Sequence, residues 1–128
     1  LRDGHCRHPL RPGVKGGKVV LISSCGFPEP DNFDALVSHV TAACKNLGRE
    51  FVGALLRPSG PIMKILVEME MPPQEIFDAA KEAGRQLVKN GAMDPALLST
   101  IQQVIVPRET FIEQANQHIQ QTLDSLNK

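Results

Sequence analysis

KVVLISSCGFPEPDNF, residues 18–33, is the stretch of sequence that decides the fold. It opens with an uninterrupted apolar run, rich in β-branched residues, and passes into a polar loop at the serines of positions 23 and 24. An apolar run without alternation is typical of a strand that is buried on both faces of a parallel sheet. The stretch therefore predicts a buried strand at about residues 18–24, then a loop and the start of a helix.

A helix and a second strand follow this first strand. Apolar residues recur at three- and four-residue spacing through residues 32–47, as in a helix with one apolar face, and Asp31 or Asn32 is the expected cap. The run EFVGALLR then predicts a second strand at about residues 50–57. A strand, a helix and a strand joined by short connections form a βαβ unit, whose strands are parallel and whose crossover is right-handed.

The rest of the chain predicts helices. Residues 62–71 suit either a strand or a helix, but a preceding proline and apolar side chains at helical spacing favour a short helix. Asp94 and Pro95 mark another helix by a cap and a first-turn proline. The longer helices are expected at about residues 73–90, 94–105 and 108–126. The last helix is expected to bury one apolar face, made of Phe111, Ile112, Ala115, Ile119, Leu123 and Leu126.

These elements predict an α/β fold, a three-layer partial domain with two parallel strands. It would be a single unit with an extended N-terminal segment (1–17), a βαβ core (18–61) and a helical C-terminal extension (62–128). Two strands do not make a self-sufficient sheet, so either further strands outside these residues or self-association as a homo-oligomer is expected to cover the open edges. The first residue is Leu1 rather than Met, which also suggests a fragment or a processed product.

Composition argues against several classes of partner. The 14 Lys and Arg residues balance the 14 Asp and Glu residues, which removes the electrostatic reason to expect nucleic acid or a membrane surface. The chain has no Trp or Tyr for stacking on bases, and no apolar run approaches the roughly 20 residues that cross a bilayer. Cys6, Cys25 and Cys44 are odd in number and widely spaced, which fits a reducing cytoplasm better than a disulfide framework.

The loop after the first strand is the candidate ligand site. In open α/β sheets, ligands bind beyond the carboxyl ends of the strands. Ser23 and Ser24 offer hydroxyl groups at this position, and Gly26 allows a ligand to approach the backbone closely. Phe27 can lie against a flat ring.

Two motifs in this region carry a resemblance. KVVLISSCGFPEPDNFDAL and the later EFVGALLRPSGP resemble the fourth and fifth strands of flavodoxin-like NAD(P)H-dependent FMN oxidoreductases, over roughly residues 15–61. The resemblance implies two-electron chemistry in which NAD(P)H reduces FMN and the flavin reduces an acceptor. It also implies that the loop borders the isoalloxazine ring, with cofactor contacts from Ser23, Ser24, Cys25, Gly26, Phe27 and Pro28.

The sequence departs from this family at the phosphate end of the cofactor. The family's first strand and its Ser/Gly-rich phosphate loop have no counterpart here. Phosphate anchoring needs backbone N–H groups that converge at a helix N-terminus, whereas Gly13, Gly16 and Gly17 precede a strand. The isolated chain is therefore expected to bind FMN weakly or not at all, and to be inactive alone.

Other interpretations stay open at this point. Cys25 lies before a helix N-terminus that can activate a thiol, with His39 as a base in principle, although a small residue packed at a turn is the expected role. The stretch Gly4-His-Cys-Arg-His8 holds metal donors, but the second donor pair of a zinc site is missing, so a loop is expected. A non-catalytic module that binds itself or a partner through its C-terminal helices is the alternative function.

Overall fold

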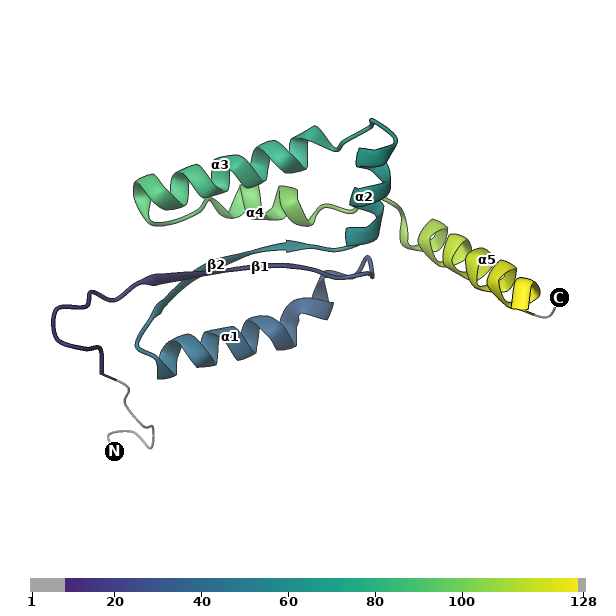
Figure 1. Ribbon diagram of the computed structural model, residues 1–128. Helices are drawn as coiled ribbons and strands as arrows, with labels where there is room; N and C mark the ends of the chain where they lie inside the picture. Colours follow the sequence, from purple (N-terminus) through teal and green to yellow (C-terminus); the bar gives the residue numbers. More distant parts are fainter. Residues whose placement is uncertain (1–8, 127–128) are drawn as a thin grey trace.

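A computed structural model describes residues 9–126 (Figure 1). Its elements are β1 (Lys18–Ser24), the short 3-10 helix η1 (Pro30–Phe33), α1 (Asp34–Asn46), β2 (Glu50–Arg57), α2 (Gly60–Glu68), α3 (Gln74–Asn90), α4 (Pro95–Gln102) and α5 (Arg108–Leu126). The predicted mixture of two strands and several helices is confirmed, and the ambiguous stretch after the second strand forms a helix, α2.

The two strands pair in parallel, as the βαβ pattern predicted. Opposite partners include Val20 with Gly53 and Ser24 with Arg57, and the register shifts once, between Val19 and Val20. Helix α1 lies on one face of this sheet, and α3 and α4 lie on the other (Figure 1). The arrangement therefore has three layers, and the carboxyl ends of both strands meet at one edge.

The core lies between β2 and the pair α3–α4. Ala79, Ala83, Met93 and Ile101 form a buried cluster, against which apolar residues of both strands pack. Full burial of a side chain the size of isoleucine contributes about 2 kcal/mol to folding. The backbone of Gly53 approaches this cluster closely, since a Cβ atom there would lie 2.9 Å from the Met93 Cε atom. Small residues on α3 and the glycine on β2 thus let helix and sheet pack tightly.

The prediction that the first strand is buried on both faces is wrong. No residue of β1 is fully buried, and the Ile22 side chain is 75% exposed although it ends the apolar run that begins at Val19. The physical reason is the lateral position of the covering helices. The helix α4 packs over β2, so the β1 side of the same face has little above it.

Two helix ends differ from the expected positions. The predicted helix at 32–47 begins as η1, and neither Asp31 nor Asn32 caps α1, whose N-cap is Phe33 without a side-chain hydrogen bond. The helix α4 is capped by Asp94, which accepts a hydrogen bond from Ala96 N, but it ends at Gln102 rather than near 105. The backbone becomes extended at Gln103, and carbonyls at this end of α4 accept hydrogen bonds from the Arg57 side chain, which is described below.

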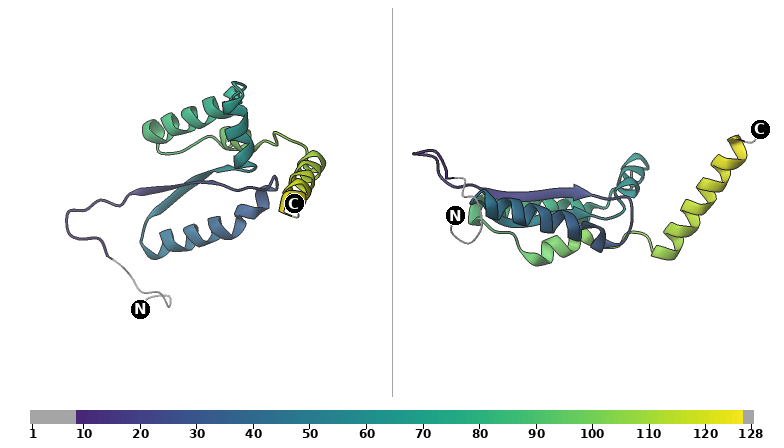
Figure 2. Two further views of the ribbon diagram at one scale, coloured as in Figure 1. Left: turned by 45° about the vertical axis from the view of Figure 1, so that its right-hand side comes forward. Right: turned by 90° about the horizontal axis from the view of Figure 1, so that it is seen from below.

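The expected burial of an apolar face on the last helix is also wrong. No residue of α5 is fully buried, and Ile119 and Leu126 are 56% and 76% exposed. Figure 2 shows the reason, because α5 extends away from the layers and no described element covers it. Its clearest link to the rest is an ion pair between Arg108 Nε and Glu29 Oε1 at 2.6 Å.

The N-terminal segment has no helix or strand over residues 9–17, as expected for an extended segment. The possible metal donors near His5 and His8 lie outside the described residues. Over residues 9–126 no group of His, Cys, Asp and Glu is arranged to hold a metal ion. Within the same range, no helix is long and apolar enough to cross a membrane.

Candidate functional site

The loops that follow the two strands are joined to each other by backbone hydrogen bonds. Cys25 N donates to Arg57 O at 3.1 Å, and Gly60 N donates back to Cys25 O at 2.8 Å. Ser59 N donates to Phe27 O at 2.9 Å. The loop that resembles a flavin contact is therefore held in place by the loop after β2.

Two residues that follow β2 shape the contact between the two loops. Ser59 is buried and has a left-handed backbone with a φ of 54°, which is uncommon for a residue other than glycine. Gly60 packs directly on the end of β1, because a Cβ atom there would lie 3.1 Å from the Ser24 Cβ atom. The RPSG sequence after β2 thus shapes the base on which the first loop rests.

The predicted cofactor-binding residues divide into two groups. Ser23 and Ser24, at the end of β1, line a pocket between the sheet and the helices. The other four, Cys25, Gly26, Phe27 and Pro28, lie beyond the strand and do not line it.

Among these four, Phe27 is 60% exposed and Pro28 is buried. The Cys25 Sγ atom lies 3.3 Å from Phe27 O, where its thiol donates a weak hydrogen bond. The loop therefore presents an aromatic ring to solvent at the carboxyl edge of the sheet, beside a half-buried thiol. His39 is exposed on α1, and within residues 9–126 no hydrogen bond joins it to Cys25.

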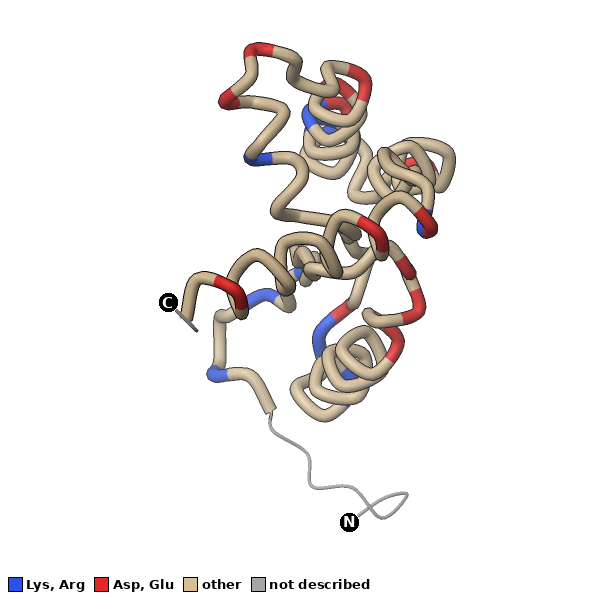
Figure 3. The backbone as a smooth tube through the Cα atoms, turned by 90° about the vertical axis from the view of Figure 1, so that its right-hand side faces the viewer, with Lys and Arg blue, Asp and Glu red and all other residues tan. Residues whose placement is uncertain are grey.

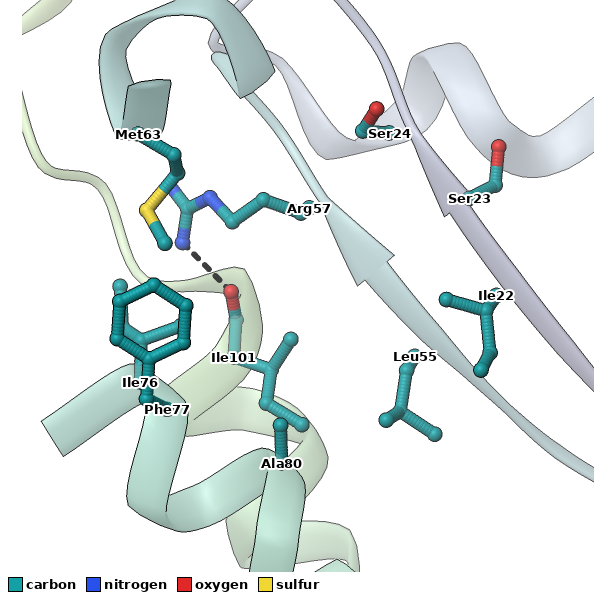
Figure 4. Close-up of a pocket in the computed structure, with 10 residues that line it drawn as sticks. All are labelled: Ile22, Ser23, Ser24, Leu55, Arg57, Met63, Ile76, Phe77, Ala80 and Ile101. Atoms are coloured by element: carbon teal, nitrogen blue, oxygen red, sulfur yellow. Dashed lines mark hydrogen bonds between the residues drawn. The ribbon is translucent and has the colours of Figure 1, made fainter. Parts of the chain in front are cut away.

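The pocket encloses about 370 Å³ between the sheet and helices α2, α3 and α4 (Figure 4). Most of its lining is aliphatic or aromatic. The lining residues are Ile22, Ser23, Ser24, Leu55, Arg57, Met63, Ile76, Phe77, Ala80 and Ile101. The exposed Ile22 side chain lies at its border, so the pocket opens toward the uncovered side of β1.

Arg57 is the functional candidate that the sequence patterns did not identify. Its side chain is buried, and its guanidinium donates to three carbonyl oxygens: Nε to Pro58 O at 2.6 Å, Nη1 to Ile101 O at 2.6 Å and Nη2 to Gln103 O at 2.8 Å. Burial lowers the pKa of the guanidinium below its ordinary value. None of the ion pairs within residues 9–126 includes it.

A signal for Arg57 was present in the sequence. Arg57 is the last residue of an apolar strand and precedes a Pro-Ser-Gly-Pro turn. Because helices are expected to cover both faces of a parallel strand, its charge is expected at a covered position. No local sequence pattern shows which carbonyl groups accept hydrogen bonds from its guanidinium. Those belong to the end of α4, more than 40 residues later.

Comparisons with known proteins do not place the chain in a family. No family model matches the sequence, no curated protein matches it, and no solved structure matches the fold. A function for this chain therefore has to be inferred from its residues and its geometry.

Proposed function

We propose that this chain supplies the ring-binding edge of a flavodoxin-like, FMN-dependent oxidoreductase that takes electrons from NAD(P)H, in a reducing, cytoplasmic setting. The observation that carries the proposal is the exposed Phe27 ring, held at the shared carboxyl edge of two parallel strands. That edge is where ligands bind in open α/β sheets. The FMN phosphate would be bound by polypeptide outside these residues, because the sequence has no Ser/Gly-rich loop that opens a helix and binds phosphate through its backbone N–H groups.

The loop has the properties that contact with a flat, conjugated ring requires. An aromatic side chain provides a face for stacking, and the adjacent Gly26 leaves the backbone open, since nothing lies within 4 Å of the position its Cβ would take. The loop's own carbonyls are partly engaged by Ser59 N and Gly60 N, which fixes its conformation before a ligand arrives. A preformed site loses less conformational entropy on binding.

The test compares FMN with riboflavin, which has the same ring and no phosphate. Because the proposed contacts are to the ring alone, both should quench with similar and weak affinity on titration of this chain, read by flavin fluorescence. Phe27→Ala should weaken the flavin affinity about fivefold, because stacking on an aromatic ring contributes on the order of 1 kcal/mol. Val88→Ala, at an 89% exposed position on α3, is the control and should change nothing.

Either of two results would contradict the proposal. Unquenched flavin at saturating protein would remove the ring site. Quenching that is equal in the wild type and in Phe27→Ala would show that the flavin binds elsewhere.

A second candidate function is a self-associating module, which one observation favours. Helix α5 carries apolar side chains that no described element covers, and the outer edge of β1 pairs with no strand within residues 9–126. Uncovered strand edges and apolar helix faces both promote association. A homo-oligomer would bury them without any flavin chemistry.

A further inference from the structure

We propose that the pocket between β1, β2 and the helices α2–α4 binds a small amphipathic anion, with an apolar body and one carboxylate or similar group that pairs with Arg57. The pocket shares Ser23 and Ser24 with the predicted flavin contacts, but the ring-contact residues Gly26 and Phe27 do not line it. It does not depend on the proposed oxidoreductase function.

The size and lining of the pocket select the body of the ligand. A volume of about 370 Å³ lies within the ~300–1,000 Å³ range of small-molecule sites. Ile76 and Ile101 are almost completely buried at its base, and Phe77 and Met63 provide further apolar surface. A hydrocarbon chain or a small ring fits such walls, whereas a strongly polar ligand would lose its hydration without compensation.

Arg57 selects the charge of the ligand. Buried charges in proteins are usually paired with an opposite charge, yet the partners of this guanidinium are neutral carbonyl oxygens. Ile101 lies in the last turn of α4 and Gln103 is its C-cap, and the partial negative charge of this helix end stabilises the cation only in part. A guanidinium has more N–H donors than these three bonds use, and Arg57 lines the pocket (Figure 4).

An anionic group in the pocket would therefore gain a charge-assisted hydrogen bond at little entropic cost. The three existing bonds already hold the guanidinium in one orientation. Such bonds are about twice as strong as neutral ones.

The experiment uses three probes of equal chain length: octanoate, octanol and octylammonium. Binding is followed by NMR of the isoleucine methyl groups, because Ile22, Ile76 and Ile101 line the pocket whereas Ile112 and Ile119 lie on α5. We expect octanoate to shift only the pocket methyls and to bind about tenfold more tightly than octanol, with octylammonium weakest. Equal binding of octanoate and octanol would overturn the role of Arg57, and shifts confined to α5 or absent altogether would overturn the site.

Two variants that place opposite charges at position 22 separate an effect on binding from an effect on folding. Because this side chain is 75% exposed, Ile22→Glu and Ile22→Lys should fold alike. The glutamate should weaken octanoate binding about threefold and the lysine should strengthen it by a similar factor, as expected for charges separated by the width of the pocket. Ala42→Glu, at an exposed position on α1, is the control. Identical affinities in the two Ile22 variants would contradict the proposal.

Discussion

Arg57 joins three parts of this fold through one side chain. It ends β2, donates a hydrogen bond to the carbonyl of its neighbour Pro58, and donates two more to carbonyls at the C-terminal end of α4. The orphan carbonyls at a helix end need partners, and a cation is favoured there by the helix dipole. Arg57 thereby satisfies carbonyls at the C-terminal end of α4 and places a positive charge beside an apolar pocket.

Gly60 offers the sharpest prediction at the residue scale. Gly60→Ala should destabilise the protein by about 1–3 kcal/mol, because the new methyl group would lie 3.1 Å from the Ser24 Cβ atom and 3.4 Å from Cys25 O, in a junction tied by backbone hydrogen bonds. Urea unfolding followed by circular dichroism measures this.

Gly84→Ala is the matched control for that substitution. Gly84 lies inside α3, and nothing lies within 4 Å of the position its Cβ would take. The alanine should therefore stabilise the helix by up to about 1 kcal/mol. Opposite signs for the two variants are expected, and a neutral Gly60→Ala would show that the two loops are not tightly joined.

At the scale of elements, the beginning of α5 is held by a pH-sensitive contact. The hydrogen bond and ion pair with Arg108 lower the pKa of Glu29 below its ordinary value. A carboxyl group whose pKa is lowered in the folded state stabilises that state above its unfolded pKa, and the contribution disappears as the pH falls through the lower, folded pKa. The contact should therefore persist at neutral pH and be lost only in acid, at a pH below the ordinary pKa of a glutamate side chain.

The measurement is an NMR pH titration of Arg108 Nε–H. We expect its resonance to move with an acidic midpoint that lies below that of an ordinary glutamate. Glu29→Gln should abolish the transition, and Glu109→Gln, in the first turn of α5, should leave it unchanged. A transition that survives in Glu29→Gln would assign it to another group.

At the scale of the whole molecule, the described chain covers its sheet unevenly. Helix α1 lies on one face, α3 and α4 on the other, and the outer edge of β1 has no neighbour within residues 9–126 (Figure 1). Basic side chains are spread over several elements rather than gathered on one (Figure 3). The exposed apolar side chains of the described residues include Ile22 on β1 and an apolar stripe on α5, made of Ile112, Ile119, Leu123 and Leu126.

These features predict self-association that depends on α5. Sedimentation of the chain at increasing concentration should show a dimer or a larger species. Ile119→Lys should weaken the association at least tenfold, because it places a charge on the apolar stripe, whereas Gln121→Lys adds the same charge at an exposed polar position and should have little effect. A monomer at every concentration would rule out the self-associating module.

The sequence by itself determined the kinds of elements, their order and the parallel direction of the strands. Helical spacing, the apolar runs of both strands and the Asp94 cap are local signals that can be recognised from neighbouring residues alone. Two of the residues chosen as ligand contacts, Ser23 and Ser24, lie in the pocket for the same reason, because the end of a strand can be located from its own residues.

Only the tertiary structure decided which surfaces are covered. Burial depends on what packs across an element, and an apolar pattern is the same whether that space is filled or open. Ile22 therefore appeared to be interior and is exposed, and the stripe on α5 appeared to be buried and is not. Arg57 appeared to be a charged strand end and is buried against carbonyls that lie far along the chain, because hydrogen bonds between distant segments form only when the helices and the sheet pack together.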